Sequence, residues 1–211
     1  MGIVYAAELR PSKIELMAAW LPKQEWFDGG ESVRLGSFRF DDPAGEVGIE
    51  THLVGAGGRV YQVPLTYRGA PLEGAGEFLV GTLEHSVLGS RWVYDATADP
   101  VYTAELAAAL LAAKPQVEEI QEVDGRIETL PHTARIFSTG TPDAGLPELL
   151  FGVPATADGI TRIQAGGVVL AVARVLELAG AGQDGAGYLA ALTATWAGQE
   201  SPVLVATAAH A

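Results

Sequence analysis

The sequence predicts an α+β protein, in which an antiparallel β-meander flanked by two helices precedes a second antiparallel β region. Three observations predict this class. Apolar residues alternate with period two between residues 33 and 67, segments at 12–21 and 100–113 show helical spacing, and β patterns separated by glycine turns return after residue 160. With 48% hydrophobic and 18% charged residues, the chain is expected to be globular.

The first helix is predicted directly after Pro11. Ser12 follows this proline, and apolar side chains then recur at helical spacing through residues 14–21. Pro22 is expected to end the helix, since proline lacks the N–H that the next turn needs. The apolar stripe is interpreted as core.

Three strands are predicted next, at residues 33–40, 47–53 and 60–67, and they form an antiparallel meander. The two turns are expected at Asp41-Asp42-Pro43-Ala44-Gly45 and Gly55-Ala56-Gly57-Gly58. Because Pro64 cannot donate a ladder hydrogen bond, its strand is expected at a sheet edge or with a bulge. The glycine-rich residues 69–82 are predicted to form an ordered loop.

The second helix is predicted to start at Pro100, with Asp99 as its N-cap, and to end at Lys114-Pro115. We therefore divide the chain into a domain at residues 1–114, a β-hairpin extension at 115–137, an irregular connection at 138–159 and a C-terminal antiparallel sheet at 160–211. The hairpin turn is expected at Asp124-Gly125.

Composition excludes several classes of function. A net charge of −13 disfavours nucleic acid as a partner, because phosphate backbones would be repelled. The absence of cysteine excludes disulfides and thiolate metal sites, and fits the cytoplasm. No signal peptide or membrane segment is recognised. The four histidines are scattered, so neither a metal nor a cofactor is predicted.

Three ordered blocks of sequence carry a family resemblance. They are Asp41-Asp42-Pro43-Ala44-Gly45-Glu46-Val47-Gly48-Ile49-Glu50, then Val60-Tyr61-Gln62-Val63-Pro64-Leu65-Thr66-Tyr67-Arg68-Gly69-Ala70-Pro71-Leu72, then Glu84-His85-Ser86-Val87-Leu88-Gly89-Ser90-Arg91-Trp92-Val93-Tyr94-Asp95 with Asp99-Pro100. In this order the blocks resemble the N-terminal cap domain of actinobacterial maltokinases and related aminosugar kinases. The resemblance covers about residues 8–113.

In those kinases the cap is followed by the kinase N-lobe, and the hairpin at residues 160–178 weakly resembles a truncated N-lobe. An N-lobe strand normally carries a lysine for the nucleotide phosphates, but alanine stands near that place and Arg174 is the only cation in the run. No catalytic loop or acidic metal motif follows. The sequence therefore favours a protein that is not an enzyme.

The predicted partner or sugar patch combines aromatic faces with hydrogen-bonding side chains, which suits a sugar or a protein surface. Its members are Tyr61, Gln62, Tyr67, Arg68, His85, Arg91, Trp92 and Tyr94. The alternative is that Trp92 and Tyr94 belong to the core, and that His85, Ser86 and Arg91 only fix their loop by hydrogen bonds.

Six carboxylates are interpreted as structural: Asp41, Asp42, Glu46, Glu50, Asp95 and Asp99. As a lone pair, Glu46 and Glu50 are too far apart along an extended strand for retaining glycosidase chemistry. Glu50 is instead expected to pair with Arg68 or Arg91 across the meander.

Two functional hypotheses remain open. The first is a non-catalytic regulatory or interaction protein that docks on a kinase or another enzyme of trehalose, maltose, α-glucan or aminosugar metabolism. The second is a small carbohydrate-binding protein, or an enzyme related to sugar phosphotransferases, with a site around His85 and Arg91. The sequence alone does not separate them.

Overall fold

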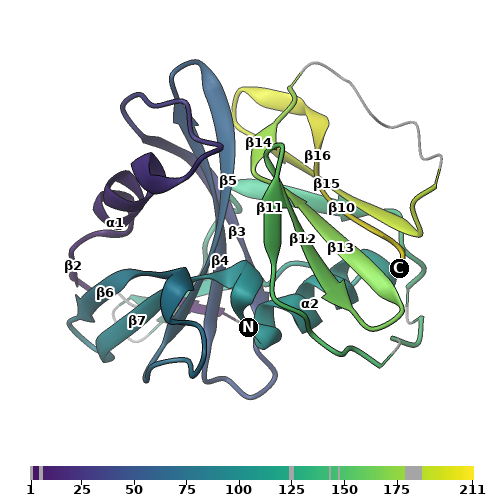
Figure 1. Ribbon diagram of the computed structural model, residues 1–211. Coiled ribbons are helices and arrows are strands. Elements are labelled where there is room, and N and C mark those ends of the chain that lie inside the picture. The colour runs from purple at the N-terminus through teal and green to yellow at the C-terminus, as the bar shows by residue number, and fades with distance from the viewer. Residues whose placement is uncertain (1, 5–6, 124–125, 143, 147, 179–186) are drawn as a thin grey trace.

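The computed structural model describes residues 2–4, 7–123, 126–142, 144–146, 148–178 and 187–211. Two larger β-sheets lie side by side, with helix α1 on the outer face of one and helix α2 between the two (Figure 1). Nearly all strand pairs are antiparallel, and the two helices are short. The predicted α+β class is confirmed at this level.

The first sheet has the strand order β2-β6-β7-β5-β4-β3, and β14 adds to β5. Its strands are β2 (Leu9–Arg10), β3 (Val33–Asp41), β4 (Gly48–Ala56), β5 (Arg59–Arg68), β6 (Leu79–His85), β7 (Gly89–Asp95) and β14 (Val175–Leu176). The predicted meander is β3-β4-β5. Its second turn is tight because Gly57 and Gly58 both have positive φ, of 57° and 81°, as a type I′ hairpin requires.

Two expectations about this sheet are wrong. Strand β5 is interior, since it pairs with β4 on one side and with β14 and β7 on the other. Pro64 is tolerated because its missing N–H falls between these two partners: the pairing with β14 ends near Gln62, and that with β7 begins at Leu65. Residues 79–82, expected at the end of the loop 69–82, instead begin strand β6 (Leu79–His85), which pairs with β7 as a hairpin.

Both predicted helices are present. Helix α1 (Lys13–Trp20) starts with a capping box between Ser12 and Glu15, and the 3₁₀ turn η1 (Leu21–Lys23) follows it. Helix α2 (Pro100–Leu111) has Asp99 as N-cap, whose carboxylate accepts from the Val101 N–H. Two further 3₁₀ turns are η2 (Gly76–Phe78) and η3 (Ala96–Ala98).

The second sheet has six strands in the order β10-β15-β16-β13-β12-β11, all antiparallel. They are β10 (Ala134–Ser138), β11 (Ala155–Ala157), β12 (Ile160–Ala165), β13 (Val168–Ala173), β15 (Ala190–Trp196) and β16 (Gln199–His210). A third sheet joins β1 (Gly2–Val4), β8 (Glu119–Val123) and β9 (Arg126–Thr129). The strands of the predicted acidic hairpin are β8 and β9, but its turn, Asp124-Gly125, lies outside the described residues.

One apolar core spans both larger sheets and α2. It includes Phe38 and Leu53 from the first sheet, Leu106 from α2, and Leu170 and Val205 from the second sheet. A smaller core lies beneath α1. Because the main core is continuous, the two sheets bury each other's apolar faces.

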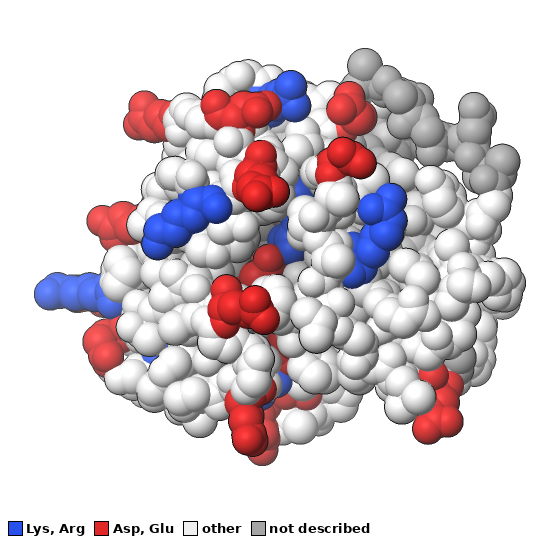
Figure 2. Space-filling view, viewed as in Figure 1, with Lys and Arg blue, Asp and Glu red and all other residues white. Residues whose placement is uncertain are grey.

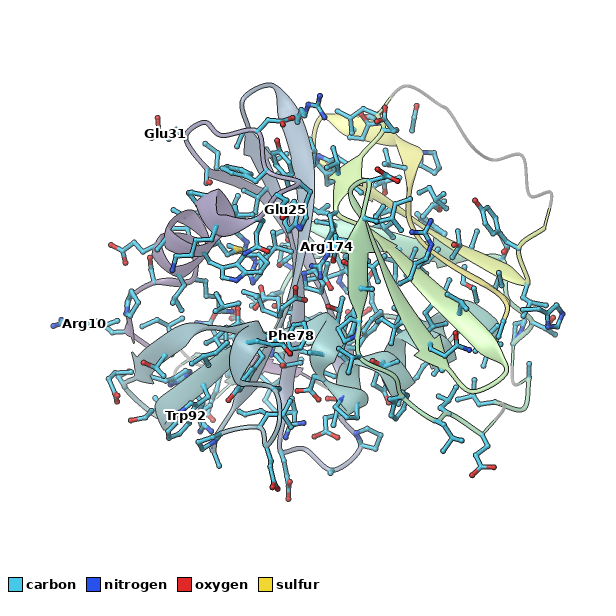
Figure 3. All side chains as sticks on the ribbon, in the orientation of Figure 1. Arg10, Glu25, Glu31, Phe78, Trp92 and Arg174 are labelled. Carbon is cyan, nitrogen blue, oxygen red and sulfur yellow. The ribbon has the colours of Figure 1, made fainter. Side chains whose placement is uncertain are left out.

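A buried ion pair crosses between the sheets. Arg174, just after β13, is only 1% exposed, and its Nη2 lies 2.6 and 2.9 Å from the carboxylate oxygens of Asp95 at the end of β7. The same guanidinium donates to Thr97 at 3.0 Å and, through Nε, to Thr161 at 2.6 Å. Figure 3 shows Arg174 in the centre of the molecule. Asp95 and Thr97 belong to the first half of the chain and Thr161 to the second, so this arginine joins them.

Main-chain hydrogen bonds make the same connection. The Gln62 N–H donates to the carbonyl of Arg174 at 2.9 Å, and β14 continues this pairing along β5. The Gln62 side chain donates to the carbonyls of Ala173 at 3.2 Å and Val205 at 3.1 Å. The second sheet is therefore hydrogen-bonded to the first as well as packed against it.

Replacing Arg174 is expected to destabilise the whole fold. Arg174→Met leaves the Asp95 carboxylate buried without its cation, and we expect a loss of about 3–5 kcal/mol in the free energy of unfolding. Urea denaturation measures this loss, and Arg162→Met, at an exposed position on β12, is the control. In the double variant Asp95→Asn with Arg174→Met, part of the stability returns because no charge is left unpaired. Equal losses for Arg174→Met and Arg162→Met would contradict the role of the pair.

Candidate functional site

A cavity of about 420 Å³ opens between α1, the β3–β4 turn and the β6–β7 hairpin. Apolar residues, among them Leu9, Phe40 and Leu88, form part of its wall. Its polar lining side chains are Lys13, Arg39, Asp41, Asp42, Glu46, Tyr67, His85 and Arg91. The volume falls in the range typical of small-molecule sites. Segments far apart in sequence thus place cations, carboxylates and an aromatic ring around one space.

The β6–β7 hairpin is fixed by its own side chains, as the structural alternative predicted. His85 Nδ1 accepts from the N–H groups of Val87 and Leu88 at 3.2 and 3.1 Å, which places the proton of the neutral ring on Nε2. Arg91 donates to the Leu88 carbonyl at 2.6 Å, and Ser86 accepts from the Glu8 N–H. Burial and the nearby Arg91 lower the pKa of His85, so its ring is neutral at pH 7.

Glycine at residue 69 leaves room for the guanidinium of Arg91. A Cβ at Gly69 would lie 2.7 Å from Nη1 of Arg91, so a side chain there would displace the guanidinium. The glycine after β5 therefore accommodates the arginine, which the hydrogen bond to Leu88 holds against the hairpin turn.

The β3–β4 turn is built on Asp42. Its carboxylate accepts from the N–H groups of Ala44, Glu46 and Val47 at 2.9, 3.0 and 2.9 Å. Burial opposes ionisation, but these hydrogen bonds outweigh it and lower the pKa of Asp42. Asp42 is therefore a structural carboxylate, while Glu46 on the same turn is exposed.

A polar cluster lies beneath α1, beside the cavity. Glu50 is 3% exposed and forms ion pairs with Lys13 and with Arg34. His52, fully buried, has Nδ1 3.7 Å from Glu50 and Nε2 3.0 Å from the Tyr67 hydroxyl. The carboxylate favours a proton on Nδ1, so Nε2 accepts the hydrogen bond that Tyr67 donates.

The electrostatics of the cluster follow from burial. Burial lowers the pKa of His52 to about 4, although Glu50 opposes the shift. Burial would raise the pKa of Glu50, but His52, Lys13 and Arg39 outweigh it and hold that pKa well below its ordinary value. Burial and Glu50 raise the pKa of Tyr67. Glu50 is thus ionised and His52 neutral near pH 7.

The predicted partners of Glu50 are wrong. It pairs with Lys13 from the helix and Arg34 from the neighbouring strand, not with Arg68 or Arg91. Arg68 instead makes two 2.7 Å hydrogen bonds to Asp99, the N-cap of α2. The cause is the side-chain direction: Arg68 faces α2, whereas Glu50 faces α1.

The structure brings three members of the predicted patch, Tyr67, His85 and Arg91, to the cavity wall. Arg68 and Gln62 are used in structural bonds, as described above. Tyr61 is buried against Trp26 and Phe27, and its hydroxyl accepts from the Asp28 N–H.

Two aromatic members remain. The buried Tyr94 accepts from the Leu72 N–H at 3.0 Å, which holds the loop after β5. Trp92 is half-buried on β7 and does not line the cavity; Figure 3 shows it well away from Arg174. Tyr94 is thus a core residue, as the alternative interpretation proposed.

Sequence reasoning missed Lys13 and Arg39, which complete the cationic side of the cavity. A signal existed for Arg39, which lies opposite Glu50 on paired strands, because such residues share a face. No sequence signal placed Lys13 at the cavity, because the position of α1 over the sheet depends on tertiary packing.

A second cavity, of about 850 Å³, lies between residues 23–28 and the β11–β12 hairpin. Trp26 lines it, and the guanidinium of Arg174 lies 5.6 Å from the centre of that ring. Charged side chains of both signs, including Lys23, Glu25 and Asp158, surround the opening. Figure 2 shows the molecule hollowed near its centre, with charges of both signs around the hollow.

Comparison with protein families finds a match within the first half of the chain. Residues 20–99 match the maltokinase N-terminal cap domain. The match begins at the end of α1 and ends at the N-cap of α2, so it covers the meander and the β6–β7 hairpin. It confirms the resemblance carried by the three sequence blocks. No significant match to a curated protein was found.

Most of the cavity lies in the matched segment. Of the polar lining residues only Lys13 lies outside residues 20–99. Asp95, the partner of Arg174, lies inside the cap, and Arg174 lies beyond it. Among the described residues no group of three or more His, Asp or Glu side chains suits a metal ion. No helix in the same residues has the length and apolar character needed to cross a membrane.

Acidification is expected to destabilise the cap through His52. Between its ordinary pKa of 6.5 and its folded value of about 4, the unfolded chain binds a proton that the folded chain does not. The free energy of unfolding should therefore fall by about 3 kcal/mol over this window as pH decreases. The lowered pKa of Glu50 extends the fall below pH 4.5.

Urea denaturation at several pH values between 7 and 5 measures this effect. His52→Gln keeps an acceptor for Tyr67 but cannot titrate, so its stability should change far less with pH in this window. His210→Gln, at an exposed position near the C-terminus, should behave like the parent protein. A pH dependence unchanged in His52→Gln would contradict the assignment.

Proposed function

We propose that this protein is a non-catalytic interaction protein related to the maltokinase cap, acting on an enzyme of trehalose, maltose, α-glucan or aminosugar metabolism. Support comes from the match at residues 20–99, which links the chain to the maltokinase family. In this proposal the second sheet takes the place that the kinase N-lobe has next to a cap.

The observation that carries the proposal is the burial of Arg174. It is the only cation of the run 168–176, where a kinase strand presents a cation to phosphates. Here its guanidinium is 1% exposed and bonded to Asp95, Thr97 and Thr161. A cation used inside the core is not available to a nucleotide, which supports a role without phosphoryl transfer.

An exposed apolar segment beside β12 is the contact that we propose for the enzyme. Leu150 is 68% and Val153 77% exposed, while neighbouring main-chain atoms of Gly152 and Gly166 bond this segment to the sheet edge. Figure 2 shows few charges over the right-hand part of this view, where strands of the second sheet lie. Uncharged surface is less costly to desolvate, as in the centre of protein interfaces.

The test measures, by biolayer interferometry, whether the purified protein binds purified maltokinase or purified trehalose- and glucan-metabolising enzymes. Leu150→Glu with Val153→Glu should weaken the complex at least tenfold. Ile127→Glu, on β9 at a position 73% exposed, is the matched control and should bind normally. Absence of binding to every enzyme would reject the proposal, and equal weakening by the control would reject the proposed surface.

A second candidate function is binding of a small carbohydrate in the cavity of about 420 Å³. The specific observation in its favour is that Tyr67, His85 and Arg91, three members of the predicted sugar patch, line this one space. An aromatic face with adjacent charged and polar groups is a common carbohydrate environment.

Isothermal titration calorimetry with maltose, trehalose and glucosamine tests this candidate. Tyr67→Ala should weaken binding of the sugar that binds, because the ring forms part of the wall. Trp92→Ala, a patch member outside the cavity lining, is the control and should keep the parent affinity. No heat with any of the sugars at millimolar concentration would reject the candidate.

A further inference from the structure

The second sheet ends in an open edge along residues 150–157. Strand β11 pairs with β12 on one side, and in the strand order of the described residues it has no neighbour on the other. The residues before β11 follow the same side of β12: Phe151 forms a bridge with Ala165, and the Gly152 N–H donates to the Gln164 carbonyl at 2.8 Å. One side of this segment is therefore paired with β12, and the other side faces outward.

The β11–β12 turn determines which main-chain groups point outward. Asp158 and Gly159 form a two-residue turn, and both have positive φ, of 52° and 69°, as a type I′ hairpin requires. The residues that flank such a turn form a hydrogen-bonded pair, so the next pair, Thr156 and Thr161, is a non-hydrogen-bonded pair. Their hydroxyl oxygens lie 2.7 Å apart, which fits the closer side chains of such pairs. The N–H and C=O groups of Thr156 therefore point away from β12.

The cavity of about 850 Å³ leaves space beside this edge. Thr156 is exposed and lines the cavity, and residues 23–28 lie on its opposite side. In Figure 1 the free side of β11 faces the first sheet. The apolar part of the cavity wall consists of partly exposed side chains: Trp26, Ile160, Val175 and Leu204. Free main-chain groups beside a pocket for side chains are the features that bind extended peptides by strand addition.

The charges around the cavity favour a basic partner. Arg59 is paired with Asp28 at 3.0 Å, so these two charges offset each other. The other charged lining residues that the structure describes are one cation and three carboxylates: Lys23, Glu25, Asp158 and Glu177. The excess of carboxylates attracts a positively charged segment. It also disfavours a second copy of this chain, whose net charge is −13.

We propose that an extended, basic segment of a partner protein adds to the free edge of β11, with main-chain hydrogen bonds to Thr156 and side chains in the cavity beside Trp26. The proposal rests on the contact proposed above for the enzyme, because Leu150 and Val153 lie on the same edge segment. It adds the conformation and the charge of what binds there.

The first experiment is fluorescence anisotropy with three labelled peptides. One alternates valine and lysine, the second has glutamate in place of lysine, and the third keeps the lysines but carries methyl groups on its main-chain nitrogens. The lysine peptide should bind at least tenfold more tightly than either of the others. The glutamate peptide has the wrong charge, and the methylated peptide lacks the main-chain donors that strand addition needs.

Variants of Thr156 test the edge directly. Thr156→Pro removes the outward N–H, and proline is compatible with an edge strand when its nitrogen faces away from the partner strand. It should weaken binding of the lysine peptide at least fivefold, because one hydrogen bond is lost and the ring occupies its place. Thr156→Ala loses the same hydroxyl but keeps the N–H, so it is the matched control and should bind like the parent protein. Circular dichroism and thermal unfolding establish that both variants are folded.

A second pair of variants tests the charge. Asp158→Asn combined with Glu177→Gln should weaken binding of the lysine peptide at least fivefold, and asparagine tolerates the positive φ of the turn. Glu128→Gln, at an exposed position on β9, is the control and should leave the affinity unchanged. Equal losses in the control and in the double variant would overturn the charge assignment as non-specific attraction.

The remaining outcomes separate this proposal from the proposed function. No binding of the lysine peptide, equal binding of its methylated form, or equal affinities of Thr156→Pro and Thr156→Ala would overturn strand addition, while the docking surface of Leu150 and Val153 could still bind an enzyme. A dimer in analytical ultracentrifugation that Thr156→Pro abolishes would assign the edge to a second copy and overturn the proposal. Peptide binding as expected, without binding to any enzyme tested, would reject the proposed function and support the strand-addition site.

Discussion

The buried ion pair between Arg174 and Asp95 is the constraint on which the arrangement of the two sheets depends. A guanidinium that is 1% exposed must be matched by acceptors, because an unpaired buried charge costs several kcal/mol. Asp95 and Thr97 from the first half of the chain supply acceptors for Nη2, and Thr161 from the second sheet supplies one for Nε. Because these groups come from both sheets, the buried pair and the apolar core hold the sheets in the same relative placement.

Much of the fold was predictable from local signals, because helix capping and hairpin turns depend on residues that are neighbours in sequence. Asp99 before Pro100 marked the start of α2, and Gly57-Gly58 marked a hairpin turn. The start of strand β6 was missed because it contains Gly81 and follows a glycine-rich stretch that resembles a loop. The strand that contains Pro64 was wrongly expected at a sheet edge or with a bulge. The missing N–H of Pro64 falls in the gap between β14 and β7, and this gap is visible only in the pairing of the whole sheet.

The candidate site was predictable only in part for the same reason. Tyr67, His85 and Arg91 were identified as members of one patch, but Lys13 and Arg39 were not. The patch member Gln62 instead forms hydrogen bonds to the second sheet. Residues near Gln62 in the sequence give no sign of this contact. The polar cluster of Glu50 and His52 lies on the same face of the sheet as the candidate cavity. Glu50 pairs with Lys13 beneath α1, and Arg39 and Arg91 belong to the cavity lining beside it.

The addition of β14 to β5 has a consequence for the exposed edge of the first sheet. Without β14, the first half of β5 would present unpaired main-chain N–H and C=O groups, and free strand edges of this kind recruit strands from other molecules. A fragment ending after α2 would therefore tend to self-associate. By pairing with β5, the segment that leads out of the second sheet therefore occupies the edge at which a strand of another molecule could otherwise add.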